Sequence, residues 1–131
     1  MSDSKIPIVT AYLEAAQRQD IPTMRAAFTD DFVYRVPGRG PLAGVSRGPD
    51  AAIAYFGAIM RLTGGTYAIT EVVDWLESAD RVALVAREQA SRNGRMVEWT
   101  RIILFTFRGP LISSVSLFDD ALYELDEMLV S

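Results

Sequence analysis

The chain has 131 residues, half of them hydrophobic, and a formal net charge of −4. This length and apolar content predict a single domain with its own core, spanning residues 1–131. The acidic balance and the lack of a basic cluster argue against nucleic acid as a partner.

The chain contains no cysteine and no histidine. These absences exclude disulfides, thiolate nucleophiles, cysteine zinc sites, histidine bases and Ser-His-Asp triads. Any catalysis therefore depends on carboxylates, tyrosine, lysine, arginine, hydroxyl groups or bound water, and we expect neither a metal ion nor a cofactor. The chain begins without a signal-peptide pattern and has no apolar run of ~18 residues, which favours a cytoplasmic protein without membrane contact.

Two short amphipathic helices are predicted at the start of the chain. Behind Pro7, the apolar residues of the first recur at helical spacing: Ile8, Val9, Tyr12, Leu13 and Ala16. The second begins at 20–22, and its apolar stripe is Met24, Ala27 and Phe28. A short strand over 32–36 follows and stops at Pro37.

A Gly/Pro-rich loop leads from this strand to a third helix over 49–62. Ile53, Phe56 and Met60 lie on one face of that helix, and Gly64-Gly65 ends it. The loop sequence PGRGPLAG lacks the GxxxxGK[ST] pattern of a phosphate-binding loop, so we interpret it as a turn at the rim of a pocket.

Four strands and a last helix complete the predicted elements. The strands span 67–76, 81–91, 96–107 and 111–118, and the helix spans 121–129. Asn93-Gly94 lies between the second and third of these strands and is the strongest short hairpin signal that a sequence offers. Asp119 and Asp120 precede the last helix, where capping is a commoner role for aspartate than acid catalysis.

The Asn93-Gly94 turn sets the register of this hairpin if it is a two-residue type I′ turn. Glu88 then lies opposite Trp99, and Arg101 is its diagonal neighbour on the same face. A three-residue loop would instead set Glu88 against Glu98, a like-charge pair that costs about a few tenths of a kcal/mol or more. The first register is therefore preferred, and it predicts a polar cluster of Glu88 and Arg101 beside a large indole.

Two interpretations of this cluster remain open. On the concave face of a curved sheet, a few polar groups in an apolar cup are the usual signature of a ligand site. Glu88 could then act as a general base, and Arg101 could hold an enolate, carboxylate or carbonyl oxygen. On the opposite face the two residues would form an ordinary cross-strand ion pair of little energetic value.

The segments 82–86 and 102–105 are apolar on consecutive residues. A strand with one face in water should alternate, so this sheet is expected to be covered on both faces. The helices cover one face. We expect a second copy of the chain to cover the other, giving a homodimer through the sheet, and the alternative is cover by the C-terminal helix.

The order of these elements resembles the SnoaL-like branch, related to ketosteroid isomerase, of the NTF2-like superfamily. The strongest local matches are DDFVYRVPG, AGVSRGPDAAIAYF and RGPLISSVSLFDD, and the resemblance covers essentially the whole chain. It implies an α+β cone, in which a curved, mostly antiparallel sheet wraps around N-terminal helices and encloses a pocket, usually in a dimer. Members include cyclases, isomerases, epoxide hydrolases and non-catalytic binders, so the fold does not choose a reaction.

The reaction sets that the resemblance implies are not intact in this chain. Val36 stands where ketosteroid isomerase-like members keep a basic aspartate. Leu84, Ala86 and Ser116 stand where limonene epoxide hydrolase-like members have acidic and basic residues, and SnoaL-type cyclases also place an acid near Ser116. The tyrosine of the epoxide hydrolase site is matched by Tyr34.

The resemblance also places Glu88, Trp99 and Arg101 on the pocket side. The predicted catalytic residues are Glu88, Arg101 and Tyr34. The predicted ligand-binding residues are Tyr12, Phe56, Met60, Trp99, Ser114, Ser116 and Phe118. Tyrosines at the spacing of Tyr12 and Tyr34 are also common in ordinary cores.

We expect a cofactor-independent isomerase, cyclase or hydrolase that acts on a hydrophobic small molecule, of the kind found in secondary metabolism. A non-catalytic binding protein of the same shape is the alternative. A dimerising interaction module is a third reading, which requires that Trp99 and Phe56 fill the cup.

Overall fold

The computed structural model describes residues 3–130, so Met1, Ser2 and Ser131, at the ends of the predicted domain, lie outside the described residues. In chain order its elements are α1 (Ile6–Gln17), α2 (Ile21–Ala26), β1 (Phe28–Val36), β2 (Gly44–Arg47), α3 (Ala51–Leu62), β3 (Ala68–Glu77), β4 (Arg81–Arg92), β5 (Arg95–Arg108), β6 (Leu111–Asp119) and α4 (Leu122–Val130). Within residues 3–130, every helix is too short or too polar to cross a membrane.

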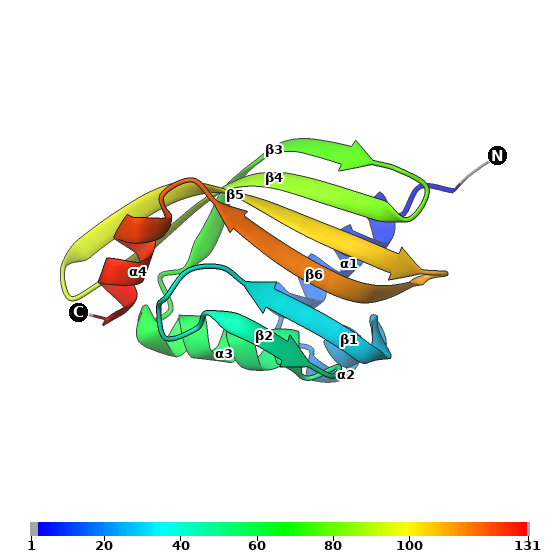
Figure 1. Cartoon of the computed structure of the whole chain (residues 1–131), viewed down its shortest axis with the longest axis horizontal. Helices are drawn as coiled ribbons and strands as arrows, with labels where there is room; N and C mark the ends of the chain where they lie inside the picture. Colours follow the sequence, from blue (N-terminus) through cyan, green and yellow to red (C-terminus); the bar gives the residue numbers. More distant parts are fainter. Residues whose placement is uncertain (1–2, 131) are drawn as a thin grey trace.

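The described strands form one curved sheet of six strands in the order β2-β1-β6-β5-β4-β3. β1 and β6 are parallel, and the other neighbouring pairs are antiparallel. Figure 1 shows α1 and α3 on one face of the sheet, here named the inner face, and α4 at the end where the β4–β5 hairpin projects. This arrangement is the α+β cone that the sequence predicted.

The β4–β5 hairpin has the predicted register. Asn93 and Gly94 have φ angles of 53° and 81°, which a type I′ turn requires. Glu88 lies opposite Trp99, and Ala86 lies opposite Arg101. All four side chains are buried on the inner face, because alternate residues of both strands point toward the helices.

The core lies between the helices and the inner face. Val9 of α1 and Ala52 of α3 are buried against strand residues that include Leu84 and Phe105. A neighbouring cluster joins Trp99 to Leu125 and Met128 of α4. Since α4 packs beside Trp99 on the inner face, the alternative that the C-terminal helix partly covers the other face is wrong.

The face of the sheet that points away from the helices, here named the outer face, keeps apolar side chains in contact with solvent. Ile102 of β5 is 39% exposed and Phe118 of β6 is 52% exposed. They lie opposite each other in the β5–β6 pairing. Cover of this face by a second copy of the chain therefore stays a prediction.

Two segments differ from the predicted elements. β1 begins at Phe28, which the sequence assigned to a helix, because Phe28 pairs with Ile112 of β6 and its ring lies 4.1 Å from that of Phe32. The predicted loop contains β2, which pairs with β1. The residues of β2 are all exposed, so no apolar alternation reveals this edge strand in the sequence.

The prediction that Asp119 and Asp120 cap the last helix is wrong. α4 begins at Leu122, and the carboxylates of both aspartates bind elsewhere. Asp119 accepts hydrogen bonds from the guanidinium of Arg101, and Asp120 accepts one from the backbone N–H of Thr100. Both aspartate side chains thus bind residues of β5 instead of capping α4.

Candidate functional site

A cavity of about 260 Å³ lies between the inner face, α1 and α3. Its walls are mostly aromatic and aliphatic, and its lining residues are Tyr12, Leu13, Ala16, Gln17, Gln19, Tyr34, Ala52, Tyr55, Phe56, Met60, Tyr67, Ala68, Ile69, Arg101, Ile103, Phe105, Val115 and Leu117. A concave, largely apolar space with a few polar groups is the usual form of a small-molecule site.

Five residues that the sequence singled out lie around this cavity: Tyr12, Tyr34, Phe56, Met60 and Arg101. They come from α1, β1, α3 and β5, four elements that are distant in sequence. The cavity is open rather than filled by Phe56, so the condition for the third reading, a cup filled by its own side chains, is not met.

Glu88 and Trp99 lie behind the cavity wall instead of lining it. Glu88 is only 1% exposed and is screened by Tyr67 and Arg101, which do line the cavity. Trp99 packs against α4 and Tyr67. The expectation that Trp99 forms a wall of the pocket is therefore wrong, and Glu88 can reach a ligand only through a neighbour.

Ser114, Ser116 and Phe118 lie on the outer face, so the prediction that they line the pocket is wrong. They pair with Thr106, Leu104 and Ile102, which also point outward. The cause is a β-bulge in β6, where Phe107 pairs with Ile112 but Thr106 pairs with Ser114. The extra residue, Ser113, reverses the alternation, so that Val115 and Leu117 face the cavity instead.

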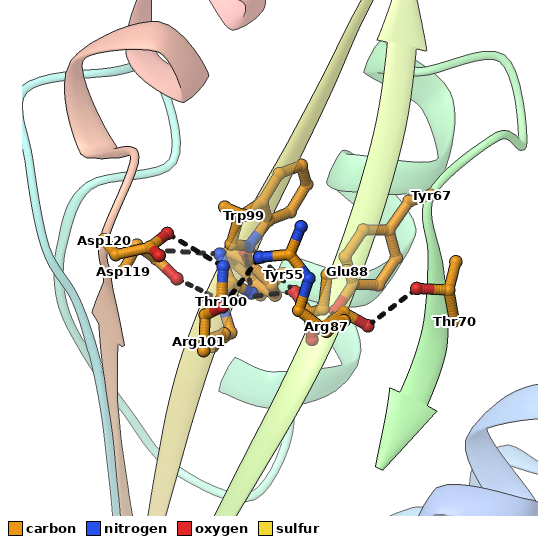
Figure 2. A network of polar contacts seen from close by, with 10 residues as sticks. All are labelled: Tyr55, Tyr67, Thr70, Arg87, Glu88, Trp99, Thr100, Arg101, Asp119 and Asp120. Carbon is orange, nitrogen blue, oxygen red and sulfur yellow. Dashed lines mark hydrogen bonds and ion pairs between the residues drawn. The ribbon is translucent and has the colours of Figure 1, made fainter. Parts of the chain in front are cut away.

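Arg101 is the centre of a buried network (Figure 2). Its Nε donates to Oδ1 of Asp119 at 2.6 Å and lies 3.3 Å from Oε1 of Glu88. Its Nη2 donates to Oδ2 of Asp119 at 3.2 Å, and its Nη1 donates to the hydroxyl of Tyr55 at 3.0 Å. Arginine carries five N–H groups, so one on each Nη atom is left beyond these contacts.

Glu88 accepts two hydrogen bonds and forms an ion pair with Arg101. Trp99 donates its indole N–H to Oε1 at 3.1 Å, and Tyr67 donates its hydroxyl to Oε2 at 2.9 Å. Burial raises the pKa of Glu88, while the charge of Arg101 and these hydrogen bonds offset part of the rise. Glu88 is thus a carboxylate with increased proton affinity, one hydroxyl away from the cavity.

Arg101 keeps its positive charge in this network. Burial acts to lower its pKa, but Tyr55, Glu88, Tyr67 and Asp119 together hold the pKa well above its usual value. Burial also raises the pKa of the tyrosines around the cavity, namely Tyr12, Tyr34, Tyr55 and Tyr67. Their hydroxyl groups therefore carry their protons at neutral pH.

Three members of the site were not predicted from the sequence. Tyr55 could have been found, because Ala52, Tyr55, Ile59 and Met60 recur at the spacing of one helix face. Asp119 lies opposite Arg101 in the β5–β6 register, which the bulge at Ser113 hides from sequence counting. Tyr67 directly precedes β3 and carries no pattern that marks it.

The Gly/Pro-rich loop, predicted as a pocket rim, borders a different and much smaller cavity. This space of about 10 Å³ is lined by loop residues such as Pro37 and Gly40 and by Arg101 and Asp119. It is just large enough for a water molecule. Within residues 3–130, no three carboxylates come together in an arrangement that could hold a metal ion.

The sequence matches the family of SnoaL-like domains over residues 9–115. A protein of Mycobacterium tuberculosis strain H37Rv, described as uncharacterised, is 33% identical over 117 residues, which are 88% of each chain. The chain spans nearly the whole of that relative.

Solved structures have the same architecture. Bal32a, from a soil-derived mobile gene cassette, is 28% identical, with 95% of each chain covered and a TM-score of 0.87. An NTF2-like protein from Burkholderia xenovorans LB400 is 23% identical, with 93% of this chain and 95% of that chain covered and a TM-score of 0.81. The second likeness concerns the fold alone.

Proposed function

The chain belongs to the family of SnoaL-like domains, and on this premise we propose that it enolises an uncharged, hydrophobic carbonyl compound without a cofactor. The observation that carries the proposal is the pair of donors, Arg101 and Tyr55, at the buried end of an otherwise aromatic cavity. Enolisation is a step that isomerases and cyclases of carbonyl compounds share, so the proposal favours these two classes.

The size and walls of the cavity support a compact aromatic or polycyclic ligand. Its volume of about 260 Å³ lies slightly below the range of roughly 300–1,000 Å³ that is common for drug-sized ligands. Tyr34 and Tyr55 lie with ring centroids 5.2 Å apart, and Phe56 and Phe105 add further apolar surface. A molecule of one or two fused rings fits these dimensions.

The charge balance around Arg101 favours an uncharged ligand. Glu88 and Asp119 carry a charge of −2 when both are ionised, against +1 on Arg101. The net charge of the network is then −1, and it becomes zero if Glu88 takes up a proton. Since Arg101 has no uncompensated charge in either state, an anionic ligand would add negative charge to a buried network at an electrostatic cost.

The donors at the buried end are suited to a carbonyl oxygen. The oxygen of Tyr55 accepts from Arg101, so its own proton is directed to another acceptor. Tyr34 also lines the cavity and keeps its hydroxyl proton, so it can donate to the same oxygen. Donors placed where negative charge develops stabilise an enolate more than the ketone from which it forms.

Tyr67 and Glu88 supply a route for the proton. The Tyr67 oxygen takes the proton from the carbon next to the carbonyl, and the Tyr67 hydroxyl proton passes to Oε2 of Glu88. This leaves a neutral Tyr67, a protonated Glu88 and an enolate whose oxygen is held by Tyr55 and Arg101. The raised pKa of Glu88 suits a base that must accept a proton near neutral pH.

A binding protein without catalysis is the second candidate. It is favoured by one observation, namely that no carboxylate of residues 3–130 lines the cavity directly. In that case Arg101 and Tyr55 would only anchor the carbonyl, and Glu88 would only balance the charge of Arg101.

Deuterium exchange of a model ketone separates the two candidates. 2-Acetylnaphthalene is incubated with the protein in D₂O, and loss of its methyl signal is followed by NMR while its affinity is measured by fluorescence titration. We expect the protein to accelerate exchange, and Glu88→Gln and Tyr67→Phe to lower the rate about 10²-fold or more. The affinity of Glu88→Gln should stay within a few fold of that of the intact protein, because Glu88 does not line the cavity.

Tyr123→Phe is the matched control, since this tyrosine of α4 is 84% exposed and lies outside the cavity. It should change neither exchange nor affinity. Binding without accelerated exchange would reject enolisation in favour of the binding protein. Failure of the ketone to bind at all would reject both.

A further inference from the structure

The end of α1 has an unusual backbone conformation beside the cavity. Gln19 has a φ of 56°, in the left-handed region that glycine occupies most easily. Its N–H donates to the carbonyl of Ala16 at 3.1 Å, and the N–H of Asp20 donates to that of Ala15 at 2.9 Å. These two bonds form a Schellman motif, in which Gln19 takes the position that is usually glycine.

Glutamine is an unfavourable choice for that position if only the backbone is considered. A side chain in the left-handed region costs roughly 1–2 kcal/mol, and glycine would avoid this strain. Strain of this kind is common where a side chain serves a binding site. The side chain of Gln19 therefore needs an explanation outside the helix cap.

The surroundings of Gln19 provide one. Gln19 and Gln17 both line the cavity and are both exposed, which places them at its opening, whereas Arg101 is 2% exposed at its buried end. Among residues 3–130 the side-chain amide of Gln19 makes no hydrogen bond. It is a free donor and acceptor at the entrance of an aromatic chamber.

We infer that Gln19 recognises a second polar group of the ligand, a hydroxyl or carbonyl at the end opposite to the one held by Arg101 and Tyr55. This inference rests on the proposed function and names the substrate class more narrowly: an uncharged carbonyl compound with a polar group at each end. An amide suits either a hydroxyl or a carbonyl, because it can donate and accept.

The test compares two ketones of the same shape. 6-Acetyl-2-naphthol carries a hydroxyl at the end remote from the acetyl group, and 2-acetylnaphthalene lacks it. We expect the intact protein to bind the hydroxylated ketone about 2–10-fold more tightly, the range of one net hydrogen bond. Gln19→Ala should abolish that preference, so that the two ketones bind this variant equally tightly.

Two further variants sharpen the result. Gln19→Gly should also abolish the preference and, by relieving the left-handed strain, raise Tm by a few degrees. Gln89→Ala, on the outer face of β4, is the matched control and should keep the preference. A preference that survives both Gln19 variants, or that is absent from the intact protein, overturns the inference. If 2-acetylnaphthalene itself does not bind, the result rejects the proposed function on which the inference rests.

Discussion

Arg101 is buried because two carboxylates accompany it. A lone guanidinium in this position would cost several kcal/mol in lost hydration, and a single partner repays that cost only with good geometry. Asp119 supplies a two-point contact, and Glu88 approaches the same Nε from β4. Because the two carboxylates balance the charge of Arg101, its remaining N–H groups can donate hydrogen bonds to an uncharged ligand.

The pKa of Glu88 makes the stability of the fold depend on pH. Burial raises this pKa in the folded chain above its ordinary value of 4.5, so the folded chain holds the proton more tightly than the unfolded chain. The stabilisation that Glu88 contributes is complete when the pH is below the ordinary pKa. It is lost as the pH rises through the raised pKa of the folded chain. Glu88→Gln removes the titration while keeping the shape.

We therefore predict that Tm of Glu88→Gln minus Tm of the intact chain increases as pH rises from about 4.5 toward about 8. Thermal unfolding followed by circular dichroism measures the difference. The control is Glu98→Gln on the outer face, which makes the same chemical change at a side chain that is 54% exposed. A Glu88→Gln difference that is flat or shrinks with pH would show that the folded chain does not hold this proton more tightly.

The loop between β1 and β2 is fastened to α4 by one carboxylate. Asp126 accepts a hydrogen bond from the backbone N–H of Arg39 at 2.9 Å. A Cβ on Gly40 would lie 2.8 Å from Oδ1 of Asp126, and one on Gly38 would lie 2.6 Å from Oδ2. The glycines thus let the loop approach α4 closely and close the small cavity beside Arg101.

Gly40→Ala is predicted to lower the free energy of unfolding by about 1–2 kcal/mol, because Asp126 must give up its contact with the loop. Gly57→Ala in α3 is the matched control. Its Cβ would meet only the end of Arg61 at 3.4 Å, and alanine favours a helix by up to about 1 kcal/mol. Urea unfolding should show that Gly40→Ala lowers the free energy of unfolding and that Gly57→Ala raises it. If Gly40→Ala leaves this free energy unchanged, the carboxylate of Asp126 does not hold the loop against α4.

The β4–β5 hairpin could be predicted from sequence because its information is local. Asn93-Gly94 specifies the turn, the turn specifies the register, and the register brings Glu88, Trp99 and Arg101 to one face. The placement of Glu88 behind Tyr67 could not be predicted, since it depends on how β3 and α3 close over the sheet.

β6 shows the opposite case. One extra residue, Ser113, exchanges the two faces of the strand, and nothing in the sequence marks the bulge. Because the bulge was not expected, Ser114, Ser116 and Phe118 were assigned to the site and Asp119 was not. β2 was missed for a related reason, because an exposed edge strand needs no apolar pattern. Long-range pairing, rather than local propensity, decided both outcomes.

The outer face of the sheet is where we propose that two copies of the chain associate. Ile102 and Phe118 are exposed there, with the half-buried Val85 and Leu104 on the neighbouring positions of β4 and β5. A stable interface buries at least about 1,000 Å² in total, which a face of this length can supply. The two cavities of such a dimer would open away from the interface, because they lie on the inner faces.

Sedimentation velocity should give a mass twice that of one chain, and Ile102→Lys should shift it to that of a single chain by placing a charge in the apolar contact. Val130→Lys on α4 is the control, since Val130 is exposed but lies outside the sheet. A single-chain mass for the intact protein at micromolar concentration would contradict the association.

Because Glu88 and Asp119 already balance its charge, Arg101 should select an uncharged carbonyl oxygen rather than an anion. The most direct measurement compares the affinities of 2-acetylnaphthalene and 2-naphthoate at neutral pH, since the two differ mainly in charge. We expect the ketone to bind at least about tenfold more tightly, a difference of about 1.4 kcal/mol. Tighter binding of the carboxylate would contradict this expectation, because Arg101 would then carry a positive charge that Glu88 and Asp119 do not compensate.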